Sequence, residues 1–183
     1  MAEDWRLTRT VALIGLMGAG KTAVGRALSA RLNVPFDDSD DAIEAAAAMT
    51  IPEIFENYGE AFFRRREGEV IARLLQGSPC VLSTGGGAWL TEETRARIQS
   101  GGTALWLDAP VELLWQRVRH RDSRPLLRTA DPRGTLERLH AQRAPVYALA
   151  DLHLDVRAED DIAATAERVI GLLKQEAGVL EAA

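Results

Sequence analysis

The chain has 183 residues, a length that fits one domain with a single core and leaves no room for two ordinary domains. Hydrophobic residues make up 46% of the sequence and charged residues 27%, a composition that excludes a disordered chain. The net charge of −5 argues against a surface built for nucleic acid, and no apolar run approaches the ~20 residues of a membrane helix. We therefore expect a single domain over residues 1–183 that binds neither nucleic acid nor a membrane.

The N-terminal sequence and the lack of a membrane-length apolar run predict a cytoplasmic protein, which we also expect to be a monomer. The first four residues, Met-Ala-Glu-Asp, are acidic and lack an apolar core, so they do not predict a secretory signal. The single cysteine, Cys80, excludes an internal disulfide and a metal site built from several cysteines. It lies in an apolar run, which predicts buried packing rather than reactivity.

Five short apolar runs predict β-strands, and segments with helical periodicity separate them. The expected strands are residues 10–16, 34–37, 80–84, 103–108 and 152–156. Thr50 to Glu53 form a capping-box pattern that starts a helix, and Thr91 stands near a second helix start. This alternation predicts an α/β fold, a central parallel five-stranded sheet with helices on both faces.

Two segments depart from the alternation, and we expect both at the edge of the sheet, where α/β folds bind their ligands. Residues 41–77 have a nearly all-helical pattern, and residues 119–134 are loop-like and rich in arginine. Between Arg117 and Arg143, eight arginines accompany three acids, a local charge of +5 that leaves −10 for the rest. Such a block is either a solvated helical face or an anion site. The tail, residues 174–183, is predicted to fray.

A glycine-rich motif follows the first expected strand directly and precedes an amphipathic helix. Its sequence, Gly-Leu-Met-Gly-Ala-Gly-Lys-Thr at residues 15–22, matches the phosphate-binding P-loop in the context that this motif needs. Backbone N–H groups of such a loop surround phosphate oxygens, and the helix N-terminus adds partial positive charge. Lys21 is one of two lysines against twenty arginines, and the Thr22 hydroxyl can ligate Mg²⁺. The alternative is a glycine-rich turn with a chance Lys-Thr pair, but the intact context predicts binding of a nucleoside triphosphate.

A P-loop fits a switch GTPase, a motor-type ATPase or a small-molecule kinase. The two asparagines, Asn33 and Asn57, are followed by Val and Tyr, so the Asn-Lys-x-Asp loop of guanine-specific GTPases is missing. Ring ATPases need more machinery than 183 residues hold. A kinase must place an acceptor hydroxyl near the γ-phosphate, among Mg²⁺ and cationic side chains.

Acidic residues gather at the end of the second expected strand. Asp38 and Asp40 lie on the same side of the chain if it is still extended there. One carboxylate could support Mg²⁺ through water while the other accepts a hydrogen bond from a substrate hydroxyl. The alternative is N-capping of the next helix, which Asp40 or Asp41 could do alone.

Several further short motifs, each taken alone, fit either a structural role or a ligand-binding role. Most arginines in the Phe-Phe-Arg-Arg-Arg-Glu run at residues 62–67 would be solvated, and Arg64 and Glu67 could simply pair on the surface. The glycine triplet at residues 85–87 is either a plain turn or a place where backbone donors approach a small ligand closely. Arg-Pro-Leu-Leu at 124–127 falls in the basic segment, and Arg-Ala-Pro at 143–145 ends the following helix.

Taken together and in order, these motifs make the chain similar to the shikimate kinase family over about residues 10–156. The set comprises the P-loop, Asp38-Ser39-Asp40, Phe63-Arg64, the glycine triplet, Arg-Pro-Leu-Leu at 124–127 and Arg-Ala-Pro-x-Tyr at 143–147. The resemblance implies a P-loop kinase fold with a helical substrate-binding insertion (about 39–77) and a lid (about 119–134). It implies transfer of the ATP γ-phosphoryl group to the 3-hydroxyl of shikimate, in chorismate and aromatic amino acid biosynthesis. Mg²⁺ is the implied cofactor, and shikimate and ATP are the implied small-molecule partners.

The resemblance also assigns roles to residues of this chain. Asp40, Lys21 and Arg124 are implied to be catalytic, with Asp40 as the candidate base that holds the acceptor hydroxyl. The implied ATP- and phosphate-binding residues are Gly18, Ala19, Gly20, Lys21, Thr22, Ala23, Arg117 and Arg124, of which Arg117 is a candidate for stacking on adenine. The implied shikimate-binding residues are Asp40, Arg64, Gly86, Gly87 and Arg143, whose two arginines clamp the substrate carboxylate. Thr22 and, through water, Asp38 are the expected Mg²⁺ ligands.

Two alternatives stay open beside this interpretation. One is another small-molecule P-loop kinase, such as a gluconate-type kinase, and the other is a catalytically idle nucleotide-binding regulator. The presence of Lys21, Thr22, Asp40 and Arg124 argues against an idle protein. Residues 157–161 offer no recognisable adenine-binding residue, and Arg65 and Arg66 leave the register of the carboxylate clamp open.

Overall fold

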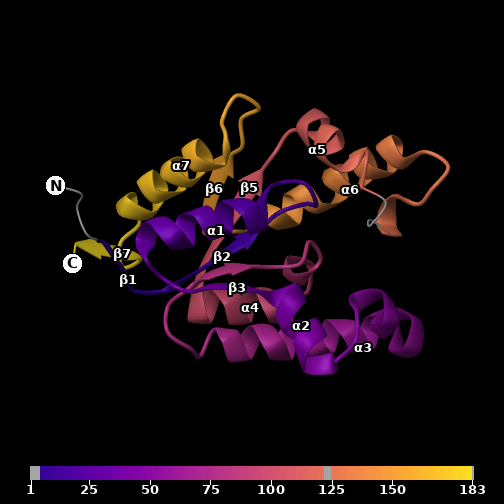
Figure 1. Ribbon diagram of the computed structural model, residues 1–183, viewed down its shortest axis with the longest axis horizontal. Helices are drawn as coiled ribbons and strands as arrows, with labels where there is room; N and C mark the ends of the chain where they lie inside the picture. The colour runs from indigo at the N-terminus through magenta and orange to yellow at the C-terminus, as the bar shows by residue number, and fades with distance from the viewer. Residues whose placement is uncertain (1–4, 122–124, 183) are drawn as a thin grey trace.

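A computed structural model describes residues 5–121 and 125–182 and shows a central sheet covered by helices (Figure 1). Five parallel strands form this sheet in the order β3-β4-β2-β5-β6. They are β2 (Thr10–Ile14), β3 (Phe36–Asp38), β4 (Val81–Ser83), β5 (Gly102–Asp108) and β6 (Leu152–Asp155). The predicted α/β fold and all five predicted strands are confirmed, with small differences at the strand ends.

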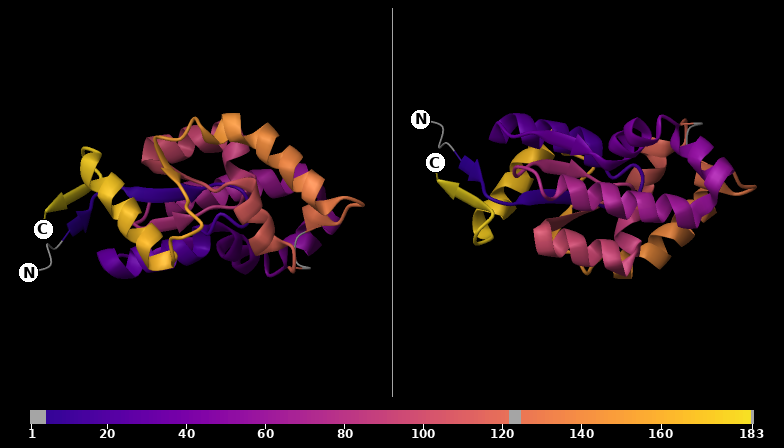
Figure 2. Two further views of the ribbon diagram at one scale, coloured as in Figure 1. Left: turned by 90° about the horizontal axis from the view of Figure 1, so that it is seen from above. Right: turned by 90° about the horizontal axis from the view of Figure 1, so that it is seen from below.

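Helices connect the strands and cover both faces of the sheet. They are α1 (Lys21–Leu32), α2 (Ser39–Ala47), α3 (Ile51–Leu74), α4 (Glu92–Gly101), α5 (Val111–Val118), α6 (Pro132–Tyr147) and α7 (Ile162–Gln175), with the short 3-10 helices η1 (Ala88–Leu90) and η2 (Pro125–Leu127). Helices α1 and α7 pack together on one side of the sheet, and α4 and α6 lie on the other (Figure 2). None of the helices within the described ranges is long and apolar enough to cross a membrane.

The core is centred on the strands β2 and β5. All five residues of β2 are buried, as are the first six of β5. Leu13 and Leu105 face each other in the β2–β5 register and expose no surface, and each such leucine contributes about 1.5–3 kcal/mol relative to an exposed one. Because helices cover both faces, these strands appear in the sequence as continuous apolar runs instead of alternating patterns.

The parallel topology brings distant parts of the sequence to one edge. The P-loop follows β2, Asp38 ends β3, the glycine triplet follows β4 and α5 follows β5. Since the five strands run in the same direction, all of these segments lie at the carboxyl edge of the sheet, where α/β proteins bind ligands.

The insertion beside β3 consists of α2 and α3, which confirms the helical pattern expected there. It has a small core of its own, formed by Ile43, Ile54, Phe63 and Val70. Helix α3 starts with the predicted capping box, in which the Glu53 carboxylate accepts from the Thr50 N–H at 2.7 Å. Gly59 interrupts α3 with φ of 78°, a left-handed conformation that glycine adopts without strain.

The two ends of the described chain pair with each other away from the carboxyl edge (Figure 1). Strand β1 (Trp5–Leu7) and strand β7 (Leu180–Ala182) form a two-stranded antiparallel sheet. The prediction that residues 174–183 fray is therefore wrong for residues 180–182. These strands have three residues each and pair across the whole length of the chain, so no local pattern marks them.

Candidate active site

The P-loop links β2 to α1 and holds its own lysine in place. Gly20 is the N-cap of α1 with φ of 99°, a conformation in which a side chain would be strained. The Lys21 ammonium donates to the carbonyl oxygens of Gly15 at 2.8 Å and Leu16 at 3.3 Å. The positive charge therefore lies over the loop at a helix N-terminus, an arrangement that suits a bound phosphate group.

A cavity of about 600 Å³ opens over this loop, a volume within the usual range for small-molecule sites. Its lining includes the predicted phosphate-binding residues Gly18, Ala19, Gly20, Lys21, Thr22 and Ala23, together with Arg117, Asp38 and Asp40. The other wall comes from the end of β6 and the start of α7, with Val156, Asp160, Asp161, Ile162 and Thr165. Sequence reasoning missed this wall because its residues follow no nucleotide-binding motif.

Asp38 contacts both the P-loop and the helix that follows it. Its Oδ2 accepts from the Thr22 hydroxyl at 3.1 Å, and the Ser83 hydroxyl lies 3.4 Å from the same Thr22 oxygen. Hydroxyl and carboxylate oxygens are donors that Mg²⁺ prefers, so this set fits the metal expected at Thr22 and Asp38. The Asp38 Oδ1 accepts from the Asp40 N–H at 2.9 Å, which makes Asp38 the N-cap of α2. Capping by Asp40 or Asp41 is therefore wrong.

Asp40 lies in the first turn of α2 and lines the cavity. Burial raises the pKa of Asp40 to about 6; the charge of Asp38 acts in the same direction and the Lys21 ammonium opposes it. A methyl group on Gly85 would lie 2.8 Å from Asp40 Oδ1 and 3.0 Å from Glu67 Oε1. Glycine at position 85 thus leaves room for two carboxyl groups beside the backbone, and the raised pKa gives Asp40 the basicity that a general base needs.

Glu67 of α3 is buried at this site, so the surface pairing considered for Arg64 and Glu67 is wrong. Its side chain is 2% exposed, and its Oε2 accepts from Arg64 Nη1 at 2.7 Å. Its Oε1 is buried and has no hydrogen-bond partner among the described residues. Burial raises the pKa of Glu67, against the effect of the Arg64 charge. Glu67 shares the buried helical face of Phe63 and Ile71, and that spacing is the signal which could have identified it.

Two arginines from different helices approach the glycine triplet. A methyl group on Gly87 would overlap the Arg64 guanidinium, and Arg143 Nη1 lies 3.4 Å from the Gly86 carbonyl oxygen. The Tyr147 hydroxyl donates to the same oxygen at 2.6 Å, and burial raises the pKa of that hydroxyl. The structure thus brings together the predicted substrate residues Arg64, Gly86, Gly87 and Arg143, and it adds Tyr147, which sequence reasoning left without a role.

The neighbours of Arg64 do not compete for this position. Arg65 and Arg66 are exposed, and Arg66 pairs with Glu69 at 2.6 Å. Of the three consecutive arginines, Arg64 is therefore the one that lies against the glycine triplet.

Arg117 of α5 crosses the P-loop. Its Nη1 donates to the carbonyl oxygens of Gly18 at 3.0 Å and Ala19 at 3.3 Å, and burial lowers its pKa. Stacking of Arg117 on adenine stays a prediction. Arg124 lies outside the described residues, so its catalytic and phosphate-binding roles and the lid over residues 119–134 also stay predictions.

Comparison with known proteins identifies the family. The family model for shikimate kinase matches residues 17–174. The chain belongs to the shikimate kinase family. It is 59% identical over 175 residues to a shikimate kinase of Ruegeria pomeroyi, an alignment that covers 96% of this chain and 90% of that protein.

Solved structures agree with this assignment. A shikimate kinase from Acinetobacter baumannii in complex with shikimate has a TM-score of 0.86 and 37% identity, covering 91% of this chain and 93% of that one. A gluconokinase from Sinorhizobium meliloti has a TM-score of 0.56 and 17% identity, covering 94% of this chain and 99% of that one. At that identity the second likeness shows the shared fold alone, so it does not support a gluconate-type kinase.

Proposed function

We propose that this chain transfers the γ-phosphoryl group of ATP to the 3-hydroxyl of shikimate, which gives ADP and shikimate 3-phosphate. The observation that carries the proposal is the convergence of three side chains on successive glycines beside the P-loop cavity. The Asp40 carboxylate lies where a side chain at position 85 would be, Arg143 lies beside Gly86 and Arg64 lies against Gly87. Membership of the shikimate kinase family supports the same reaction.

The three side chains match the chemistry of a small polyol that carries a carboxylate. Guanidinium groups bind carboxylates through paired, charge-assisted hydrogen bonds, and Arg64 and Arg143 supply two of them. The ion pair with the buried Glu67 fixes the Arg64 guanidinium before substrate arrives. A side chain that is already ordered loses less entropy on binding, so this ion pair favours substrate affinity.

Asp40 supplies the acceptor for the reacting hydroxyl. In the proposed step, Asp40 accepts the hydrogen bond of the 3-hydroxyl and takes its proton while the oxygen attacks the γ-phosphorus. The bond from that phosphorus to the bridging oxygen of ADP breaks. Base assistance of this kind contributes about 10²–10⁴-fold to a rate. Lys21 and the N-terminus of α1 offset the charge on the phosphates.

The Mg²⁺ that accompanies ATP would be held by Thr22 and, through water, by Asp38, with the Ser83 hydroxyl nearby. When bound, this ion neutralises charge on the β- and γ-phosphates. The cytoplasmic location stays a prediction. The monomeric state also stays a prediction.

A coupled assay of ADP release with shikimate, with gluconate and with neither tests the proposal. We expect release that depends on shikimate, whereas release that depends on gluconate, or on neither acceptor, contradicts it. Arg64→Lys should raise the KM for shikimate by about 10- to 100-fold because the lysine lacks the bidentate fork. Arg66→Lys is the matched control, since Arg66 is exposed two positions away on the same helix.

A further inference from the structure

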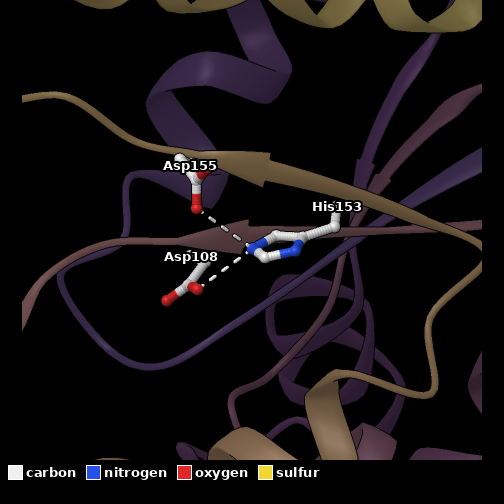
Figure 3. Close-up of side chains that lie close together, drawn as sticks. All are labelled: Asp108, His153 and Asp155. Atoms are coloured by element: carbon white, nitrogen blue, oxygen red, sulfur yellow. Dashed lines mark hydrogen bonds and ion pairs between the residues drawn. The ribbon is translucent and has the colours of Figure 1, made fainter.

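A second cluster of metal-binding side chains lies at the ends of β5 and β6, and it has no role in the proposed reaction. Asp108 ends β5, and His153 and Asp155 belong to β6. The parallel register pairs Trp106 with His153 and Asp108 with Asp155, so these side chains emerge on one face of the sheet. Figure 3 shows the His153 ring pointing toward both carboxylates. None of the three residues lines the nucleotide cavity.

One ring nitrogen faces two carboxylates in this cluster. His153 Nε2 lies 3.0 Å from Asp108 Oδ2 and 3.3 Å from Asp155 Oδ1 (Figure 3). A single imidazole nitrogen carries at most one proton, so it cannot donate a full hydrogen bond to both oxygens. Two carboxylates directly opposite on neighbouring strands repel each other. A cation among these three atoms resolves both conflicts.

A second histidine approaches Asp108 from the other side. His140 lies in α6, and its Nε2 is buried without a hydrogen-bond partner among the described residues. This nitrogen lies 3.8 Å from Asp108 Oδ1, which is too far for a hydrogen bond. A buried nitrogen without a partner needs a physical explanation, and a metal ion bound beside Asp108 provides one.

We propose that Asp108, His140, His153 and Asp155 bind a divalent first-row transition metal ion such as Zn²⁺. Ligand atoms at about 2.1 Å from a metal lie about 3.0–3.4 Å apart when the angles between them are 90–109°. The two distances from His153 Nε2 fall in that range, and the nitrogen and carboxylate oxygens of Asp108, His153 and Asp155 all lie within 4.8 Å of one another. His140 lies outside this spacing, because its Nε2 faces the other carboxylate oxygen of Asp108, Oδ1, at 3.8 Å; it would join the set after a rotation of its side chain or of the Asp108 carboxylate.

The donor atoms select the class of metal. Imidazole nitrogen combined with carboxylate oxygen suits zinc, cobalt and nickel, whereas Mg²⁺ prefers oxygen donors alone. Thr22, Ser83 and Asp38 offer only oxygen donors, so they fit the Mg²⁺ that accompanies ATP. The two places should therefore differ in their metal preference.

The surroundings hold the ligands in position. The ring of Trp106, a buried residue, stacks on the His153 ring with centroids 4.5 Å apart and planes 15° apart. The Val156 N–H donates to the Asp108 carbonyl at 2.7 Å, which joins the ends of the two strands. Ligands on strands are placed more accurately than ligands on loops, and the half-exposed His153 leaves a path for the ion.

Titration of the full chain with Co²⁺, in excess Mg²⁺ that occupies the oxygen site, tests the proposal through visible absorption. We expect saturable binding of one Co²⁺ per chain, and weaker binding at acidic pH because protons compete for the imidazole nitrogens. His153→Asn and His140→Gln should each weaken it by at least about tenfold. His120→Asn is the matched control, since His120 is the third histidine of the chain and is exposed outside the cluster.

Two further measurements separate loss of a ligand from loss of the fold. The thermal midpoint of each metal-free variant should match that of the unmodified protein. In the unmodified protein, NMR signals of the His140 and His153 rings should broaden with Co²⁺ while those of His120 stay sharp. Unchanged Co²⁺ affinity in His153→Asn or in His140→Gln overturns the proposal, as does equal broadening of all three rings. These readouts are of binding, so they do not depend on kinase activity.

Discussion

Replacing Asp40 by asparagine should make the protein more stable at neutral pH while it removes most of the activity. Burial raises the pKa of Asp40 from the ordinary 3.8 to about 6. At pH 7 the carboxyl is nevertheless ionised, so the folded protein holds a charge that water would solvate better. Asparagine has nearly the same shape and no charge, so the variant avoids this cost but cannot accept the proton of the substrate.

The raised pKa of Asp40 sets how much stability the Asp40→Asn variant should gain. A pKa that is higher by one costs the ionised carboxyl about 1.36 kcal/mol in the folded state. The rise from 3.8 to about 6 therefore means that the ionised Asp40 lowers the stability of the native state by about 3 kcal/mol at pH 7. Asparagine still buries a polar amide, which reduces the expected net gain to about 1–3 kcal/mol. Because the folded-state pKa is the higher one, the unmodified protein gains stability as the pH falls through 6. The advantage of Asp40→Asn should therefore shrink toward zero near pH 4.

Urea unfolding followed by circular dichroism at pH 7 and at pH 4 measures the free energy of unfolding, and the ADP-release assay measures kcat. We expect kcat to fall by about 10²–10⁴-fold. Asp41→Asn is the matched control, because Asp41 is the exposed neighbour in the same helical turn. The Asp41→Asn variant should lose about 0.3–1 kcal/mol of its free energy of unfolding, which is the contribution of an acid near a helix N-terminus, and it should keep its activity.

A variant Asp40→Asn that is less stable than the unmodified protein at pH 7 would refute this reasoning. A stability difference of the same size at both pH values would refute it as well, because the effect then does not come from the ionised carboxyl. If stability rises as expected but kcat changes by only a few-fold, the electrostatic account holds and the assignment of Asp40 as the base fails.

Three further predictions follow from the same site. The activity defect of Asp38→Asn should shrink as Mg²⁺ is raised in the coupled assay, whereas that of Asp40→Asn should not; the reverse pattern means that the two roles are exchanged. Arg143→Lys should raise the KM for shikimate by about 10- to 100-fold with little change in the KM for ATP, and Arg138→Lys, an exposed position on the same helix, should change neither. Amide hydrogen exchange over residues 119–134 should slow when ADP and shikimate bind together, and equal exchange in both states contradicts the predicted lid.

Most of the fold could be predicted because its signals are local. The apolar runs of β2 and β5 are continuous since both of their faces are buried, and such runs mark strands in any context. The P-loop is also local, because its glycines, Lys21 and Thr22 must be consecutive to surround a phosphate between a strand and a helix. The order of the remaining motifs carried the resemblance to the family, and the resemblance supplied the expected roles of Asp40 and Arg64.

The sequence by itself therefore determined the strands and the phosphate loop, which depend on neighbouring residues, and the family, which depends on the order of short motifs along the chain. Only the tertiary structure decided what depends on contacts between distant residues. It buried Glu67 against Arg64, made Asp38 rather than Asp40 the cap of α2, and paired β1 with β7. It also placed Asp108 beside His153. Burial and cross-strand pairing arise when separate elements pack together, and the energies that they set, such as the cost of the Asp40 charge, have no counterpart in a local pattern.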